Sequence, residues 1–315
     1  NGDFFKNLLV RCNGVVEDFA SGVMNAKVYD FTEKDLTEAD GVAESVEHGW
    51  YEYKGGDDKA LHPWEGETTP HYTEPKEGTK TEWKALNEQG KYSWLKTPKW
   101  RGKLCEVGPL ARYIVLYTKA KQGLLGELTW AEKMIVDQID AVTKLLNVPV
   151  EAWLPSTVGR TAARALDAQL QAEVSKYFFD KLVANIKSGD TKVANTEKWE
   201  PSTWPKEAKG VGLYEAPRGA LSHWAVIKDG KITNYQAVVP TTWNACPRDD
   251  AEGHGAYEMS MMDTPVKVAD KPLEIVKAVR SFDPCMACST HLFNAKGEKI
   301  RVVTTDPYAG LRIDE

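Results

Sequence analysis

Residues 156–187 read "STVGRTAARALDAQLQAEVSKYFFDKLVANIK" and carry the longest helical pattern in the chain. Apolar side chains recur at every fourth position, namely Ala162, Leu166, Leu170, Val174, Phe178, Leu182 and Ile186. A strict four-residue row drifts around a helix of about 3.6 residues per turn, so this helix should meet apolar neighbours on several sides. The pattern predicts a long helix inside a helical bundle.

Two further helices are expected ahead of it. The first has Pro109 in its opening turn and Gly123 just past its end, which is a typical start and stop pair. The second opens with Thr129 and Glu132 at the spacing of a capping box and continues with apolar residues along one face. A shorter helix is expected at residues 273–280.

The remaining segments favour strands and loops. Residues 223–240, "HWAVIKDGKITNYQAVVP", alternate around Asp229-Gly230 and predict a β-hairpin, and residues 1–53 are typical of short strands. Residues 54–105 predict a long loop that wraps a surface or builds a site. Its aromatic side chains favour burial: Trp64, Tyr72, Trp83, Tyr92, Trp94 and Trp100. The fold class expected is α+β, mainly α, with a long-helix bundle, a small antiparallel hairpin or sheet and long wrapping loops.

The composition is typical of a soluble globular protein of 315 residues, with 42% apolar and 27% charged residues. A net charge of -6 without a basic cluster excludes nucleic acid as a partner. No apolar stretch is long enough to cross a bilayer and no secretory signal opens the chain, so export would need another protein.

Five scattered cysteines disfavour a disulfide framework. The first residue is not methionine, which indicates part of a longer polypeptide.

Residues 281–291, "SFDPCMACSTH", place Cys285, Cys288 and His291 at even spacing. A structural zinc site needs four ligands and normally a second ligand pair, although a composite site with one of the other cysteines stays open. A thioredoxin-like dithiol would follow a strand, whereas the segment before this motif is helical. Two buried cysteines without a function are the third interpretation, which the flanking Asp-Pro and histidine weaken. Thiolates at this spacing suit a soft, late transition metal, and the histidine suits a harder ion.

"DPCMACSTH" resembles the C-terminal DPCxxCxxH signature of [NiFe]-hydrogenase large subunits. Six other blocks resemble successive segments of the membrane-bound, H2-uptake branch and occur in family order: "HPWEGETTPHYTEP", "YSWLKTPKWRG", "EVGPLARYI", "LPSTVGRTAARALDAQ", "APRGALSHW" and "NYQAVVPTTWN". The resemblance implies that residues 1–291 are the C-terminal portion of a large-subunit domain.

The resemblance also implies a set of metal ligands. Cys285 would be a terminal nickel ligand, and Cys288 would bridge nickel to an iron that carries carbon monoxide and cyanide. The family takes two more thiolates from an RxCGxC motif that this sequence lacks, so the chain alone holds half of the ligands. His291 and the backbone carbonyl of Ala237 would bind magnesium.

Four side chains near these ligands receive roles from the same resemblance. Arg218 would reach over the metals, donate to a cyanide nitrogen and supply a fixed positive charge, while the Cys285 thiolate accepts the proton. Thr241 would hydrogen-bond the other cyanide, and Asp283 would orient Arg218 or the cysteine loop. A lone arginine is usually a surface charge and a lone threonine is usually structural, so the assignment of Thr241 depends on the resemblance. Glu106, just ahead of a helix, is expected to be structural rather than catalytic.

The function implied is heterolytic oxidation of H2, with electrons passed to an iron–sulfur small subunit that contains the clusters. That partner would carry the export signal and, with a membrane cytochrome b, hold the enzyme at the periplasmic face of the cytoplasmic membrane. Two alternatives are a non-catalytic fragment and a metal-free structural relative of the respiratory complex I large subunit. Cys285, Cys288 and His291 argue against the metal-free relative.

Residues 292–315 resemble the C-terminal extension that a maturation endopeptidase removes from such subunits once nickel is bound. The expected cleavage lies between His291 and Leu292. The alternative is a permanent edge strand, because "KIRVVTT" has the pattern of a strand that could pair.

Overall fold

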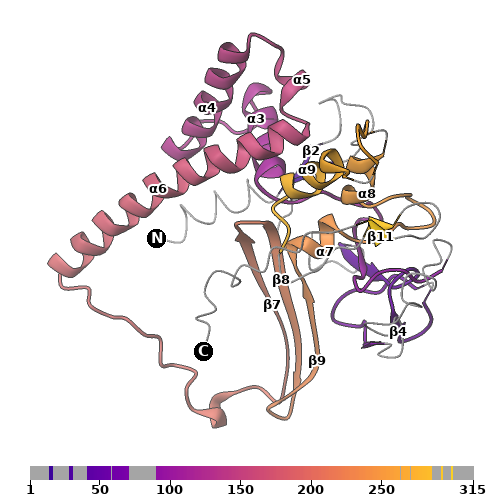
Figure 1. Ribbon diagram of the computed structural model, residues 1–315. Helices are drawn as coiled ribbons and strands as arrows, with labels where there is room; N and C mark the ends of the chain where they lie inside the picture. The colour runs from indigo at the N-terminus through magenta and orange to yellow at the C-terminus, as the bar shows by residue number, and fades with distance from the viewer. Residues whose placement is uncertain are drawn as a thin grey trace, which may run out of the picture.

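The computed structural model shows a helical layer beside small antiparallel sheets (Figure 1). It describes residues 41–57, 59–70, 90–262, 264–269 and 271–285, and the backbone of four short strands at 14–16, 28–30, 292–293 and 299–300. The predicted α+β fold class with long helices is therefore confirmed. In the described part, no helix has both the length and the apolar character that a membrane span requires.

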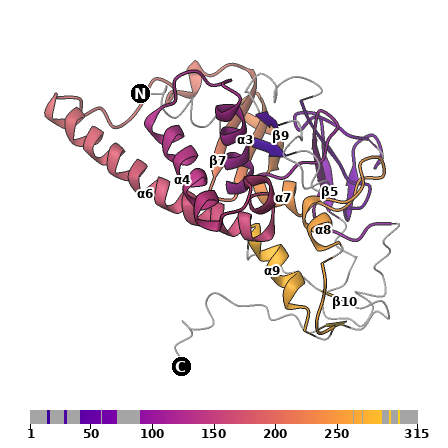
Figure 2. The same cartoon turned by 90° about the horizontal axis from the view of Figure 1, so that it is seen from above.

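The helical layer consists of α3 (Pro109–Lys121), α4 (Trp130–Leu146), the short α5 (Val150–Trp153) and α6 (Thr157–Lys187), which lie side by side (Figure 2). Their ends follow the local sequence signals. Thr129 caps α4 through a complete capping box with Glu132, and Ser156 caps α6 by accepting from the Gly159 N–H. Their common core is apolar and includes Ile114, Leu116, Ile135, Ile139, Leu154 and Leu170.

Helix α6 packs against this core only as far as Phe178. Ala163, Leu170 and Val174 are buried, whereas Leu182 and Ile186 are 56% and 54% exposed. Within the described residues, the expectation of apolar neighbours on several sides therefore fails for the last turns. The cause is length, because α6 has 31 residues and its partners α3 and α4 have 13 and 17.

A three-stranded sheet of β7 (Glu207–Ala216), β8 (Gly219–Lys228) and β9 (Lys231–Val238) follows α6 and the 3-10 turn Pro201–Thr203. The predicted hairpin between β8 and β9 is confirmed. Asp229 and Gly230 both have positive φ, 50° and 72°, as a type I′ turn requires. The sequence analysis missed β7, whose "KGVG" glycines weaken a strand pattern.

Two strands lie in the segment 54–105, which is predicted as one long loop, and each pairs with a strand in residues 1–53, where short strands are predicted. β3 (Val42–Ser45) pairs with β6 (Thr97–Trp100), and β4 (Tyr51–Tyr53) pairs with β5 (Thr68–Pro70). β1 (Gly14–Val16) pairs with β2 (Val28–Asp30). Trp100 is buried as expected, Trp94 is 41% exposed, and Tyr72 and Trp83 lie outside the described residues.

Three short helices complete the described chain: α7 (Pro240–Asn244), α8 (Ala256–Met261) and α9 (Leu273–Ser281). α9 confirms the helix predicted at 273–280. A second core, in which Trp100, Val107, Trp224 and Trp243 participate, joins the sheet to α7. After the cysteine motif, β10 (Leu292–Phe293) pairs with β11 (Lys299–Ile300).

Candidate metal centre

Helix α9 ends in a turn that presents Cys285. Phe282 closes the helix, and Asp283 then adopts the left-handed region with a φ of 56°. Aspartate tolerates this conformation better than most residues, which explains a non-glycine residue at the turn. Cys285 is half-buried and forms no disulfide. Cys288 and His291 lie outside the described residues.

Thr241 contacts the backbone of the cysteine loop. The Cys285 backbone N–H donates to Thr241 Oγ1 at 3.4 Å, across a separation of 44 residues. Thr241 is 7% exposed in the first turns of α7. Because its oxygen accepts from Cys285, its own hydroxyl proton remains free for another acceptor. The structure thus brings together two of the predicted site residues.

Arg218 lies in the tight turn between β7 and β8, and that turn lies directly on the segment ahead of α3. Gly219 has a φ of 127°, and a Cβ on it would be 2.7 Å from the Gly108 nitrogen. Gly108 has a φ of 125°, and a Cβ on it would be 3.0 Å from the Arg218 carbonyl oxygen. Because neither glycine has a side chain, the two backbones come into contact. This contact fixes the position of Arg218 relative to α3.

Arg112 of α3 also binds the β7–β8 turn. Its guanidinium donates to Glu215, to the Ala216 carbonyl at 3.1 Å and to Asp167 of α6 at 2.8 Å. One cation therefore serves two buried carboxylates. Burial raises the pKa of Glu215 to about 7, Arg112 lowers it and Asp167 raises it further. The arrangement locks the β7–β8 turn to the helical layer.

Asp283 lies between two arginines. Its Oδ1 is 3.7 Å from Arg218 Nη2 and 3.4 Å from Arg164 Nη1 of α6. The Arg218 side chain is 42% exposed, yet its Nε is buried and has no hydrogen-bond partner among the described residues. The predicted neighbours Arg218 and Asp283 are therefore close, and Arg218 retains a donor for a further acceptor.

Glu106 forms a buried pair with Arg160 of α6. Two hydrogen bonds of 2.9 Å join the carboxylate to Nε and Nη2, and the guanidinium lies 3.9 Å from the centre of the Phe282 ring. These contacts tie the segment before α3 to the end of α9. Glu106 thus has the structural role that its position predicted.

Ala237 lies near the end of β9, opposite His223 of β8. Its neighbour Gln236 accepts from Lys96 Nζ at 2.8 Å, and Lys96 also pairs with the fully buried Glu44. Burial raises the pKa of Glu44, while Lys96 lowers it. Among the described residues, Glu44 Oε1 has no hydrogen-bond partner. The sequence analysis did not identify this buried polar group.

A second group of ligand-type residues lies away from the cysteine loop. Glu47, His48 and Asp250 have ligand atoms within 4.8 Å of one another. His48 Nδ1 is 2.6 Å from the Gly90 carbonyl, and Asp250 pairs with His48 and with Arg248 at 3.2 Å. Since Asp250 already pairs with His48 and Arg248, we assign no metal to this group.

The comparison with protein families decides between the interpretations of the motif. The family model described as "Nickel-dependent hydrogenase" matches residues 6–291. The chain belongs to the nickel-dependent hydrogenase family. The metal-free relative of complex I is consequently disfavoured.

Named hydrogenases are similar along most of this chain. The uptake hydrogenase large subunits of Rhizobium leguminosarum bv. viciae and Rhodobacter capsulatus are 49% and 46% identical over 88% and 91% of the chain. These matches cover 45% and 47% of the relatives, so the chain spans about half of their length. A solved [NiFeSe]-hydrogenase from Desulfomicrobium baculatum is 31% identical, with a TM-score of 0.59 over 85% of this chain and 46% of that one.

The described residues fit the nickel–iron cofactor of this hydrogenase family. Cys285 supplies a free thiol and Thr241 a hydroxyl group, and the buried Nε of Arg218 has no hydrogen-bond partner in the described part of the chain. Donors beside a thiolate suit a metal whose own ligands accept hydrogen bonds. Sequence reasoning missed Arg164, Arg112 and Asp167, although Arg160, Arg164 and Asp167 follow the spacing of one helix face.

Proposed function

We propose that this chain is part of the large subunit of an uptake [NiFe] hydrogenase, which oxidises H2 to protons and electrons. The observation that carries the proposal is the meeting of Cys285, Thr241, Asp283 and Arg218 from separate elements, in a member of the nickel-dependent hydrogenase family. The alternative is a non-catalytic fragment. It applies to this chain in isolation, because the family's other two thiolate ligands lie in an RxCGxC motif that this sequence lacks.

In this proposal, Cys285 and Cys288 would hold the nickel–iron centre: Cys285 would bind nickel, and Cys288 would bind both nickel and an iron that carries carbon monoxide and cyanide. The bound centre supplies the site at which H2 is polarised. Arg218 would donate to a cyanide nitrogen from its Nε, which has no hydrogen-bond partner among the described residues, and would provide a fixed positive charge. The Thr241 hydroxyl would donate a hydrogen bond to the other cyanide, and the Cys285 thiolate would accept the proton from H2. Asp283 restrains Arg218.

His291 and the Ala237 carbonyl are proposed as magnesium ligands. A carbonyl and an imidazole leave room for a carboxylate ligand and for water, as a hard divalent ion prefers. The support for Ala237 is its place in "NYQAVVP", at the inner end of β9 next to the buried Gln236.

The proposed partners are an iron–sulfur small subunit, which holds the clusters that take the electrons, and a membrane cytochrome b. Together they would place the enzyme at the periplasmic face of the cytoplasmic membrane. A maturation endopeptidase would separate residues 1–291 from the extension 292–315. One observation supports this boundary: the family match ends at residue 291.

The test is purification of the full-length gene product with its small subunit, followed by metal analysis and H2-dependent dye reduction. The proposal predicts about one nickel and one iron per large subunit beyond the cluster iron, together with H2 uptake. A stable complex without nickel and without H2 uptake would leave only the non-catalytic interpretation.

A further inference from the structure

One face of α6 contacts the stretch ahead of α3 and the cysteine loop, and it is joined to the β7–β8 turn through Arg112. Arg160 pairs with Glu106 ahead of α3, and Asp167 binds Arg112 beneath the β7–β8 turn. Between them on the same face, Arg164 approaches Asp283 on the cysteine loop. The outer two contacts are buried hydrogen-bonded ion pairs of 2.8 to 2.9 Å, so they fix the helix backbone on both sides of Arg164.

The contact of Arg164 has a different character. Its Nη1 is 3.4 Å from Asp283 Oδ1, and the side chain is 32% exposed. Charge-assisted hydrogen bonds between a guanidinium and a carboxylate are normally about 2.7 to 2.9 Å long. Arg218 approaches the same Oδ1 at 3.7 Å. Asp283 therefore shares one oxygen between two arginines and makes a tight pair with neither.

We propose that Arg164 is a positioning residue for Arg218, an inference that rests on the proposed function. Arg164 offsets part of the negative charge of Asp283 and thereby weakens the attraction between Asp283 and Arg218. Arg218 therefore does not form a tight ion pair with Asp283. The repulsion between the two guanidiniums adds to this effect because they share one carboxylate. Arg218 is consequently held beside Asp283 of the cysteine loop, with an Nε that has no hydrogen-bond partner in the described part of the chain.

Removal of Arg164 should strengthen the attraction between Asp283 and Arg218. Asp283 would then pair tightly with Arg218 and draw the guanidinium away from the acceptor near Cys285. The loss would appear in the chemical step rather than in substrate binding, because H2 is small and carries no charge for Arg218 to bind. The fold should persist, since Arg160 and Asp167 anchor the helix independently.

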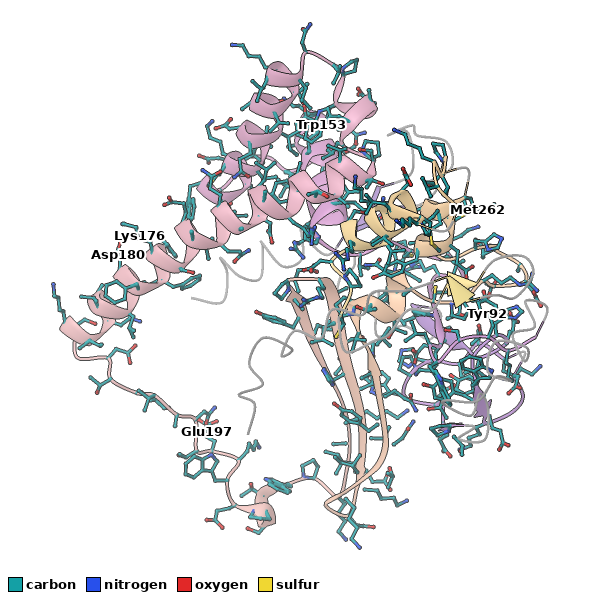
Figure 3. The ribbon with its side chains drawn as sticks, in the orientation of Figure 1. Tyr92, Trp153, Lys176, Asp180, Glu197 and Met262 are labelled. Atoms are coloured by element: carbon teal, nitrogen blue, oxygen red, sulfur yellow. The ribbon has the colours of Figure 1, made fainter. Side chains whose placement is uncertain are left out.

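The experiment uses the full-length large subunit with its small subunit, and compares Arg164→Gln, Arg164→Lys and the control Lys176→Gln. Lys176 pairs with Asp180 on the outer, exposed half of α6 (Figure 3). For Arg164→Gln we expect unchanged nickel content, shifted infrared bands of the cyanide ligands and a kcat lowered about tenfold or more, with KM for H2 changed less than about threefold. Arg164→Lys should restore part of the kcat, and Lys176→Gln should match the wild type.

A double-mutant cycle separates positioning from a general structural role. In an Arg218→Lys background, Arg164→Gln should change kcat less than about twofold, because its effect passes through Arg218. An equal loss in both backgrounds, a loss of nickel, or wild-type bands and kcat in Arg164→Gln would each overturn the inference. Failure of the proposed function is distinguishable, since it would appear as a wild-type complex without nickel or as full activity in Arg218→Lys alone.

Discussion

The Arg218 guanidinium has an anionic neighbour that restrains it, but it forms no tight ion pair with that neighbour. Its closest anionic neighbour in the described part is Asp283 at 3.7 Å, and its Nε has no partner there. An arginine differs from a lysine at this point because its planar fork can contact Asp283 and a second acceptor together. The functional weight of this residue therefore depends on shape as well as on charge.

Arg218→Lys in the full-length complex should keep the metal content and lose most of the H2 uptake, by about a hundredfold, since ammonium cannot reproduce the two directed donors. Nickel analysis and a dye-reduction assay on the same preparation measure both quantities. Arg280→Lys, an equivalent change on the exposed face of α9, is the control. A near-wild-type rate for Arg218→Lys would contradict the electrostatic role.

Glu215 predicts a dependence of stability on pH. Burial raises its pKa from 4.5 to about 7, so the folded protein keeps Glu215 protonated over a range in which the unfolded chain ionises it. Its contribution to the free energy of unfolding should therefore decrease as the pH rises between those two values. Glu215→Gln should flatten the slope of the unfolding temperature over that range, measured by calorimetry of the full-length complex. An unchanged slope would show that Arg112 keeps Glu215 ionised.

At the scale of secondary-structure elements, α6 binds the segment ahead of α3, Arg112 beneath the β7–β8 turn, and the cysteine loop. The bidentate pair between Arg160 and Glu106 is buried at both ends, with side chains 8% and 2% exposed. Loss of one partner would leave an uncompensated buried charge, which destabilises far more than loss of an exposed pair. The site therefore depends on contacts that never touch the metal ligands.

Glu106→Ala should destabilise the large subunit by about 3 to 5 kcal/mol, whereas Asp180→Ala, at an exposed pair of the same helix, should cost less than about 1 kcal/mol. Denaturant unfolding of the full-length complex gives both values. Similar small losses for the two variants would mean that the Glu106–Arg160 pair contributes no more than a surface pair.

The elements that could be predicted from the sequence are those with local causes. Caps such as Thr129 and Ser156 act within one helical turn, and the Asp229-Gly230 turn acts between adjacent strands. The pairing of β3 with β6 joins Val42 to Trp100, and no local pattern encodes such a distant partner. For the same reason, the meeting of Thr241 with Cys285 was available only through family resemblance, and the contact of Arg164 with Asp283 was not anticipated.

At the scale of the whole molecule, the chain spans about half the length of the large subunits it matches. The exposed apolar residues Leu182 and Ile186 on the outer half of α6 are consistent with further protein in the complete enzyme. The described sheet, bundle and cysteine loop nevertheless form one connected arrangement, because Arg112 of α3 binds the β7–β8 turn and α6 packs against α9.

The extension after the motif should be absent from the active enzyme. An attached tail would hold His291 away from its magnesium site, so cleavage between His291 and Leu292 is expected once nickel is bound. Intact-mass measurement of the nickel-loaded large subunit should give a C-terminus at His291. A nickel-loaded, active preparation that retains residues 292–315 would show that the tail is a permanent part of the fold.

The central claim is that Cys285 is a nickel ligand in a catalytic large subunit. The most direct measurement is the nickel content of the full-length complex carrying Cys285→Ser, compared with the wild type and with Cys105→Ser at a cysteine outside the motif. The account predicts about one nickel in the wild type and in Cys105→Ser, and a large loss in Cys285→Ser, because a serine oxygen is a hard donor that suits nickel poorly. Full nickel occupancy in a folded Cys285→Ser complex would contradict it.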